Sequence, residues 1–310
     1  MRLQQRRDLR VNRSSVQIEG VLFLAAGFGR RDEPLTYIRP KALLPFGDTS
    51  VLGRLAGQIC SVCPRRIRIN ASRCPEALLT EISMIWQEDM CELYFEERPL
   101  GASATLARHA NIMDTGTWMV VNTDMIIEDF DALGLVEHHR KTGSNWTVLT
   151  GDFPPDGNYS PLLIDEDMKF GCGGIQRTHY WGVSLMEPSI PAVAAKIQAS
   201  GGMFSELASR VAADSSRLTA CRGNGRWLDM GRIDILRRNI LSGGSFIHPT
   251  ACISSDVTLN GVWNIGRGCI LGSGTFLRDS VMLDGSSLES GTLEESILPW
   301  LCSSRDGEFV

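Results

Sequence analysis

The chain has 310 residues, of which 43% are hydrophobic and 22% charged, and its net charge is −5. This composition is typical of a soluble globular protein with one large domain and one small domain. The negative charge gives no reason to expect nucleic acid or an anionic membrane as a partner. No apolar run reaches the roughly 18 residues of a membrane span, and the arginine-rich start has no apolar segment of a secretory signal. We therefore expect residues 1–19 to be a loose tail and the protein to be cytoplasmic.

The first predicted element is the buried strand VLFLAA, which begins at Val21. The segment after it is rich in small and basic residues: Gly27, Gly29, Arg30, Arg31 and, twelve residues after Gly29, Lys41. Glycines let a backbone approach a ligand closely, and exposed backbone N–H groups suit an anion. The segment therefore indicates a phosphate-binding site, although an ordinary loop with solvated arginines would have the same composition.

Strands and helices alternate from here to about residue 141. A helix is expected over residues 50–62, capped by Asp48 or Thr49, and another begins at Pro75. Strands are also predicted over residues 66–72, 91–97 and 118–124, and helices over 102–113 and 130–141. Such alternation predicts an α/β fold, with a layered sheet that carries helices on both faces. Ligands of such sheets bind beyond the carboxyl ends of strands, where Asp124 stands.

Cysteine and histidine patterns give no metal or redox site. The nine cysteines are an odd number in a chain without an export signal, so we expect reduced thiols. Cys60 and Cys63 have the spacing of a metal or redox pair, but no second close pair follows and the pair falls at the end of a predicted helix. The five histidines show no ligand spacing, and we interpret them as structural or exposed.

From residue 245 the sequence changes to a period of six. Hydrophobic residues recur at that spacing: Ile247, Ile253, Leu259, Ile265, Leu271, Leu277 and Leu283. Four residues after each comes a mostly small or apolar residue: Ala251, Val257, Trp263, Cys269, Thr275, Val281 and Ser287. Hexapeptide repeats of this kind wind short parallel strands into a prism. We expect about two turns of a left-handed parallel β-helix.

Several motifs resemble those of the sugar-1-phosphate nucleotidyltransferases. LAAGFGRRDEPLTYIRPK matches the family's phosphate-binding signature at Gly27, Gly29, Arg31, Pro34, Leu35, Thr36, Pro40 and Lys41. EERPLGAS, from Glu96, resembles the base-binding segment, and MVVNTD resembles the strand that ends in Asn-Gly-Asp. WGVSLMEPSI (181–190) and RWLDMGRIDILRRNI (226–240) resemble two later segments. The resemblance covers residues 20 to 300, including the hexapeptide tail that many members carry.

The resemblance implies transfer of a nucleotidyl group from a nucleoside triphosphate to a sugar 1-phosphate, with release of pyrophosphate. It implies that Arg31, Lys41, Asp124 and Asp229 are catalytic, and that Asp124 and Asp229 hold Mg²⁺ as cofactor between the two phosphates. Nucleotide-binding residues would be Ala25, Ala26, Gly27, Gly29, Arg30, Arg31, Pro99 and Gly101. EERPLG is closest to the guanylyltransferases for mannose or heptose 1-phosphate, so GTP is the expected donor.

The resemblance also implies the domain organisation. A Rossmann-like catalytic domain, with a mixed and mostly parallel sheet between helices, would span residues 20–243. A left-handed β-helix would span residues 244–300 and a tail residues 301–310. Because a short prism has open ends, we expect a homo-oligomer in which loss of residues 245–310 alters assembly before chemistry.

The sequence departs from the family pattern at several positions. Arg30 stands where the family has threonine, Thr123 replaces the glycine beside Asp124, and no Glu-Lys-Pro segment for the sugar phosphate is found, Lys169 being the nearest candidate. A non-catalytic relative that binds nucleotide sugars is therefore an open alternative. A hexapeptide acyltransferase is a weaker one, because His248 sits only at the edge of a short prism.

Overall fold

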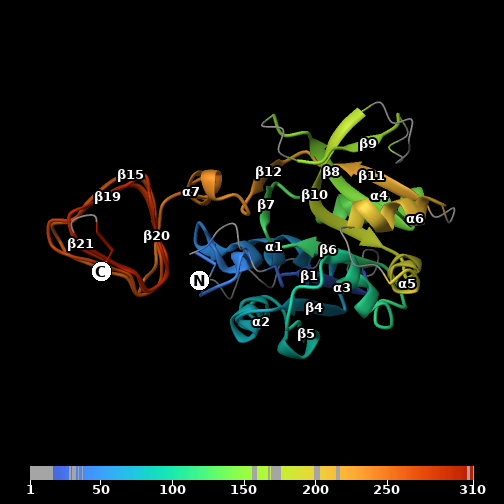
Figure 1. The fold of residues 1–310 in the computed structure, drawn as a ribbon, viewed down its shortest axis with the longest axis horizontal. Helices are drawn as coiled ribbons and strands as arrows, with labels where there is room; N and C mark the ends of the chain where they lie inside the picture. Colours follow the sequence, from blue (N-terminus) through green and yellow to red (C-terminus); the bar gives the residue numbers. More distant parts are fainter. Residues whose placement is uncertain are drawn as a thin grey trace.

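The computed structural model describes residues 17–27, 29, 33, 35–36, 38–155, 159–166, 168, 176–198, 203–213, 217–305 and 308–309. Figure 1 shows a large body and a smaller C-terminal part, with helix α7 (Ile233–Leu241) between them. In these described ranges no helix is both long and apolar enough to cross a bilayer.

The body is built on one mixed sheet in the order β11-β8-β10-β6-β1-β4-β5. Its strands are β1 (Gly20–Leu24), β4 (Arg66–Ala71), β5 (Cys91–Phe95), β6 (Trp118–Asn122), β8 (Trp146–Asp152), β9 (Leu162–Ile164), β10 (Gln176–Met186) and β11 (Leu218–Arg222). β1 runs parallel to β4 and β6, β4 runs parallel to β5, and β11 runs parallel to β8, whereas β10 is antiparallel to β6, β8 and β9. The mixed, mostly parallel sheet expected from the sequence is therefore present.

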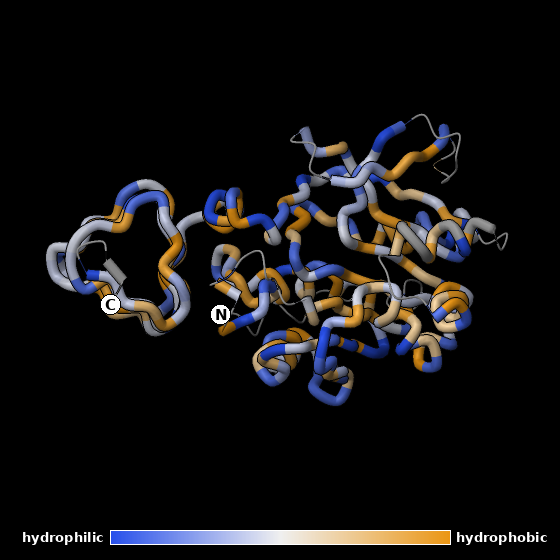
Figure 2. The backbone as a smooth tube through the Cα atoms, viewed as in Figure 1, coloured by the Kyte–Doolittle hydropathy of each residue, from blue (hydrophilic) through white to orange (hydrophobic). Residues whose placement is uncertain are grey.

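Helices cover both faces of this sheet. They are α1 (Val51–Ile59), α2 (Pro75–Ser83), α3 (Ala102–His109), α4 (Ala132–Thr142), α5 (Ser189–Lys196) and α6 (Ala208–Ala213). Because side chains alternate along a strand, Val21 and Phe23 of β1 pack into one core with α1, α2 and α4, while Leu22 packs into the other with α3, α5 and α6. Burial on both faces explains why VLFLAA is apolar throughout. Figure 2 shows hydrophobic segments running through the interior of the body.

Two boundaries differ from the sequence-based expectation. Residues 1–16 of the expected tail lie outside the described residues, but Ile18 is buried and Glu19 N donates to Thr117 O at 2.9 Å, so the body begins before residue 20. Helix α1 is capped by Ser50, whose hydroxyl accepts from Gly53 N at 2.9 Å. Asp48 and Thr49 are not the cap because β2 (Pro45–Phe46) and β3 (Thr49–Ser50) form a hairpin that delays the helix to Val51.

Cys60 begins a one-turn helix (Cys60–Val62) that follows α1, and Cys63 is the residue that caps its end. The thiols donate to backbone carbonyl oxygens, Cys60 Sγ to Gly57 O at 3.0 Å and Cys63 Sγ to Ser61 O at 3.7 Å. All cysteines in the described part of the chain are free thiols. The geometry is that of a helix end, as the sequence indicated.

Residues 245–305, here called the C-terminal coil, form two parallel sheets. One contains β13 (Phe246–Ile247), β15 (Thr258–Ile265), β17 (Phe276–Met282), β19 (Thr292–Glu294) and β20 (Ile297–Leu298). The other contains β14 (Cys252–Ile253), β16 (Ile270–Leu271), β18 (Ser287–Ser290) and β21 (Ser303–Arg305), with β22 (Glu308–Phe309) antiparallel at its edge. Successive turns stack along the viewing direction of Figure 1, and hydrophilic and hydrophobic stretches alternate around each turn in Figure 2.

The register of these sheets corrects the count of turns. Ile247 pairs with Ile265, which is three hexapeptides further on, but Ile265 then pairs with Met282 and Met282 with Leu298. The number of residues per turn therefore falls after the first turn. A strict period of six residues does not identify the later strands for this reason. Four strand levels are stacked, which corresponds to three turns instead of about two, and pairing continues to Arg305, beyond the expected boundary at residue 300. Leu283, counted as a repeat position, packs instead into the core of the body.

Candidate active site

A cavity of about 410 Å³ opens beside the carboxyl ends of β1 and β6. Its lining includes six residues expected to bind nucleotide and two expected to be catalytic: Ala25, Ala26, Gly27, Gly29, Pro99, Gly101, Lys41 and Asp124. Arg30 and Arg31 lie outside the described residues, as does Lys169. Neighbouring strands that end at one edge of the sheet bring these segments together.

The glycine-rich turn at this cavity is closely packed around Gly29. Its φ of 63° lies in the left-handed region that favours glycine, and a Cβ there would lie 2.8 Å from Thr36 and 2.9 Å from Lys41 Cε. Thr36 Oγ1 also donates to Gly29 O at 2.9 Å. Gly29 therefore lets the stem of Lys41 cross the turn at van der Waals distance.

Asn70 at the end of β4 fixes the first part of the turn, and sequence reasoning missed it. Its Oδ1 accepts from Ala25 N at 2.6 Å and from Ala26 N at 3.3 Å. These two amides are therefore committed to Asn70, so any phosphate contact through backbone N–H groups has to come from farther along the turn. A polar residue at the end of the alternating strand RIRINAS was the available signal.

Glu96 is buried, with 3% of its surface exposed, and it organises the wall opposite the turn. Its Oε1 accepts from Asn70 Nδ2 at 2.9 Å and from Thr105 Oγ1 at 2.8 Å, and its Oε2 accepts from Leu100 N at 3.0 Å. The carboxylate thus ties β4, the 96–101 segment and α3 into one unit. Buried polar networks that are fully hydrogen-bonded are rigid, so this wall of the cavity is preorganised.

Lys41, Asp124 and Asp229 meet at Gly231. A Cβ on Gly231 would lie 3.2 Å from Asp229 Oδ1, 3.3 Å from Lys41 Nζ and 3.6 Å from Asp124 Oδ2. Lys41 Nζ also donates to Gly231 O at 3.2 Å. Three of the four residues that the sequence proposed as catalytic therefore converge on one point at the edge of the cavity.

The antiparallel pair β7 (Met125–Glu128) and β12 (Arg226–Asp229) brings the two aspartates together. Asp229 pairs in register with Met125, the neighbour of Asp124, and Met230 N donates to Asp124 O at 2.9 Å. Asn239 of α7 donates to Asp229 O at 2.7 Å and anchors the end of β12. Residues more than one hundred positions apart are thus fixed by backbone pairing.

Tyr159 is a second residue that the sequence did not identify. Its hydroxyl donates to Asp229 Oδ2 at 2.6 Å, while Gly231 N donates to Asp229 Oδ1 at 2.7 Å. Burial, followed by the hydrogen bond to Asp229, raises the pKa of Tyr159 to about 12. The phenol therefore stays protonated at neutral pH and orients the carboxylate. Nothing in the sequence around Tyr159 signals this role.

The geometry also accounts for Thr123, where the family pattern has glycine. Thr123 is buried and its hydroxyl donates to Leu24 O at 2.9 Å, so the extra side chain ties the ends of β6 and β1 together.

The carboxylates of Asp124 and Asp229 fit a magnesium ion by their chemistry, because Mg²⁺ prefers oxygen ligands and commonly takes only one or two carboxylates together with substrate phosphates. No group of three or more potential metal ligands occurs among the described residues.

The histidines hold structural positions in the described part of the chain. His109 is buried with Nδ1 2.8 Å from Thr105 O, and burial lowers its pKa. His139 is buried between Thr147 Oγ1 at 2.8 Å and Glu187 Oε1 at 3.1 Å. The hydrogen bond with His139 lowers the pKa of Glu187. His248 is half-buried, and its Nδ1 lies 2.9 Å from Thr250 Oγ1.

Comparison with known proteins agrees with this geometry. Residues 21–172 match the MobA-like NTP transferase domain. The chain is 26% identical over 221 residues to the mannose-1-phosphate guanylyltransferase catalytic subunit beta of Drosophila pseudoobscura pseudoobscura, a match that covers 68% of this chain and 58% of that relative. It is 22% identical to a probable mannose-1-phosphate guanylyltransferase 1 of Oryza sativa subsp. japonica, over 90% of this chain and 85% of the relative.

A mannose-1-phosphate guanylyltransferase of Mycobacterium tuberculosis is 24% identical over 90% of this chain and 83% of its own length. The matched domain contains the glycine-rich turn, Lys41, the 96–101 segment and Asp124, which are the parts that line the cavity. Because the long matches cover 90% of the chain, they include Asp229 and at least part of the C-terminal coil. The motifs, the cavity and these relatives together support assignment of the chain to a sugar-1-phosphate nucleotidyltransferase family.

Proposed function

We propose that the protein transfers a nucleotidyl group from a nucleoside triphosphate to a sugar 1-phosphate and releases pyrophosphate. The observation that carries this proposal is the convergence of Lys41, Asp124 and Asp229 on Gly231, at the edge of the cavity lined by the glycine-rich turn. A cation and two carboxylates at one point suit a reaction between two phosphates, whose mutual repulsion is the main obstacle.

In this reaction an oxygen of the sugar phosphate attacks the α-phosphorus of the nucleotide, and the bond from that phosphorus to the bridging oxygen breaks. Lys41 would place its ammonium against the phosphate oxygens, where the stem packed on Gly29 and the bond to Gly231 O limit its positions. Tyr159 and Gly231 N would hold the Asp229 carboxylate in one orientation. Arg31 is proposed to bind the departing pyrophosphate.

Asp124 and Asp229 would hold Mg²⁺, which when bound would reduce the charge on both phosphates. The remaining contribution of the chain is positioning. Backbone N–H groups beyond Ala26 would contact the triphosphate, since the amides of Ala25 and Ala26 bond Asn70. No side chain is required as a nucleophile.

We propose GTP as the donor and a mannose-like or heptose 1-phosphate as the acceptor. The relatives named as mannose-1-phosphate guanylyltransferases support this choice. Because Glu96 already accepts three hydrogen bonds and Gly101 O accepts from Thr105 N, we assign recognition of the guanine N1–H and amine to backbone carbonyls between residues 97 and 100. A base other than guanine would leave these buried carbonyl oxygens without a hydrogen-bond donor, and this cost would make the site selective for GTP.

The test is a matrix of GTP, ATP, UTP, dTTP and CTP against several sugar 1-phosphates, with pyrophosphate release as the readout. The proposal predicts the highest kcat/KM for GTP with a mannose-like or heptose 1-phosphate. A different best base would refute the guanine assignment alone. Nucleotide-sugar binding without turnover in any combination would favour the non-catalytic alternative.

We further propose that the C-terminal coil is a left-handed β-helix and contributes a contact between subunits. Large hydrophobic side chains lie exposed on it, among them Ile270 with 51% and Leu301 with 68% of their surface exposed. Sedimentation of the full-length chain tests the second part, and a monomer at micromolar concentration would contradict it.

A further inference from the structure

The segment that leads to Lys41 rests on the C-terminal coil. Trp300, which follows β20, donates its indole Nε1–H to Leu35 O at 2.7 Å. Only 2% of Trp300 is exposed, and it belongs to the same buried core as Leu35, Ala42 and Leu44. The hydrogen bond joins residues 265 positions apart and is buried at both ends.

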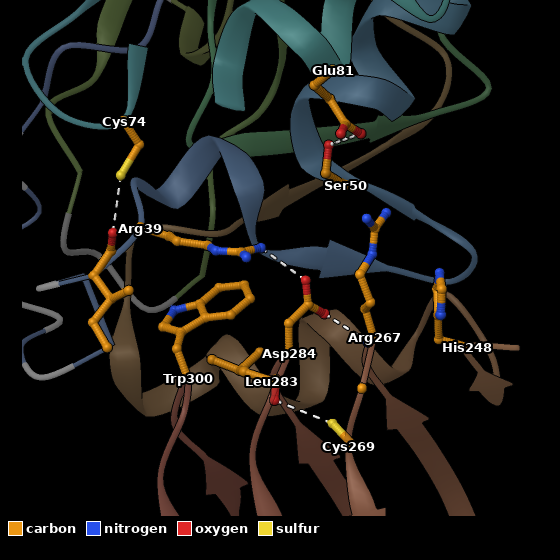
Figure 3. A network of polar contacts seen from close by, with 12 residues as sticks. Arg39, Ser50, Cys74, Glu81, His248, Arg267, Cys269, Leu283, Asp284 and Trp300 are labelled. Atoms are coloured by element: carbon orange, nitrogen blue, oxygen red, sulfur yellow. Dashed lines mark hydrogen bonds and ion pairs between the residues drawn. The ribbon is translucent and has the colours of Figure 1, made fainter. Parts of the chain in front are cut away.

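A second contact lies beside the first. Arg39 Nη1 donates to Asp284 Oδ2 at 2.8 Å, and its guanidinium lies 4.9 Å from the centre of the Trp300 ring. Figure 3 shows the arginine passing over the indole towards Asp284. Asp284 is itself held by the coil, since its Oδ1 accepts from Arg267 N at 2.8 Å. An arginine stacked on an indole and paired with a fixed carboxylate has little freedom.

From Leu35 and Arg39 the contacts continue into the active site. Thr36, the neighbour of Leu35, bonds Gly29 O through its hydroxyl, and its own carbonyl oxygen accepts from Arg73 Nη1 at 2.9 Å. Lys41 lies two residues after Arg39, and its stem packs on Gly29. A displacement of the Leu35 carbonyl would therefore shift both the glycine-rich turn and the ammonium of Lys41.

We propose that Trp300 is a positioning residue of the active site, and that with the Arg39–Asp284 pair it holds residues 35–41 in the arrangement that brings Lys41 to Gly231. The proposal rests on the proposed nucleotidyl transfer for its kinetic consequence. It differs from the expectation that loss of the coil changes oligomeric assembly before it changes catalysis. Because the coil supports the phosphate-binding segment, its loss would change catalysis directly.

The expected kinetic effect falls on kcat. Trp300→Phe keeps a ring in the core but leaves the buried Leu35 carbonyl without its donor, and we expect kcat to fall about tenfold as Lys41 loses its position. The KM for the nucleotide should rise by a smaller factor than kcat falls, because the glycine-rich turn shifts but the wall formed by Asn70, Glu96 and Thr105 is untouched. Arg39→Gln should act in the same direction, and Arg39→Lys should restore part of the loss.

Matched controls are available within the coil. Trp263→Phe makes the same substitution against the coil's own core, away from residues 35–41. Arg278→Gln removes a comparably exposed ion pair, with Glu294, on the coil surface. Both controls should leave kcat unchanged. A readout independent of turnover is hydrogen–deuterium exchange in peptides covering residues 35–44, which should quicken in Trp300→Phe and Arg39→Gln but not in the controls.

The experiment uses the full-length chain and compares thermal unfolding, kinetics and exchange for the five variants. Faster exchange with a selective loss of kcat supports the positioning role. If wild type shows no turnover while exchange still responds as described, the proposed reaction fails and the positioning of residues 35–41 stands. Unchanged exchange and kcat in folded Trp300→Phe and Arg39→Gln would overturn the inference, as would equal effects in the controls.

Discussion

Gly231→Ala is the substitution that probes the centre of the proposed site. The added methyl group would lie 3.2 Å from Asp229 Oδ1, 3.3 Å from Lys41 Nζ and 3.6 Å from Asp124 Oδ2. The first two distances are shorter than ordinary van der Waals contact, so these groups must move by a few tenths of an ångström. The methyl group would also occupy space between the three charged groups, where the reacting phosphates are proposed to lie.

The expected effect separates chemistry from stability. A misplacement of about 1 Å in a reacting group can cost about a hundredfold in rate, so a shift of a few tenths, together with the lost space, predicts a fall in kcat of about ten- to a hundredfold. Stability should change by less than about 1 kcal/mol, because replacing glycine also reduces the entropy of the unfolded chain.

The assay is steady-state pyrophosphate release, with thermal unfolding measured in parallel. Gly57→Ala is the matched control: it lies in α1, and a Cβ there meets nothing within 4 Å. The control should keep full activity with equal or slightly higher stability. Wild-type kcat in a folded Gly231→Ala variant would refute the assignment of the reaction to this point.

Three further predictions follow from other contacts. Asp124→Asn or Asp229→Asn should lower kcat by at least about a hundredfold with the fold retained, and a smaller loss would contradict the metal assignment. Asn70→Ala removes the acceptor of two cavity amides and should cost about 2–4 kcal/mol of stability and raise the nucleotide KM; unchanged values would show that the amides find other partners. Because the His139 bond lowers the pKa of Glu187, its carboxylate stabilises the fold above about pH 4.5 and loses that contribution as the pH falls. Glu187→Gln should flatten the acid limb of a stability–pH curve, and an unaltered limb would contradict this.

The layered fold could be predicted from the sequence because each element carries its own local signal. A continuous apolar run marks β1, and the spacing of apolar residues marks α1 and α2. These signals are local and do not depend on contacts with the rest of the chain. The antiparallel placement of β10 has no such signal, because strand direction depends on pairing with β6 and β8. Parallel strands in the C-terminal coil were predicted from the period of six residues. Because fewer residues make up each turn after Ile265, the same period did not predict the later strands.

The candidate site was predictable where motifs place charged residues at strand ends, as with Lys41, Asp124 and Asp229. Asn70, Glu96 and Tyr159 act through hydrogen bonds to residues distant in sequence, and the sequence does not show those distances. Trp300 is the extreme case, because its partner Leu35 belongs to the opposite end of the chain. Only the packing of the coil on the body reveals that contact.

The central claim is transfer of the nucleotidyl group, and the most direct measurement follows phosphorus. Phosphorus NMR of the wild-type chain with GTP, Mg²⁺ and mannose 1-phosphate should show pyrophosphate and a nucleoside-diphosphate sugar appearing in equal amounts, with the α-phosphate of GTP retained in the sugar nucleotide. Lys41→Met should abolish both signals. Formation of GDP and inorganic phosphate, or of pyrophosphate without a sugar nucleotide, would contradict the account.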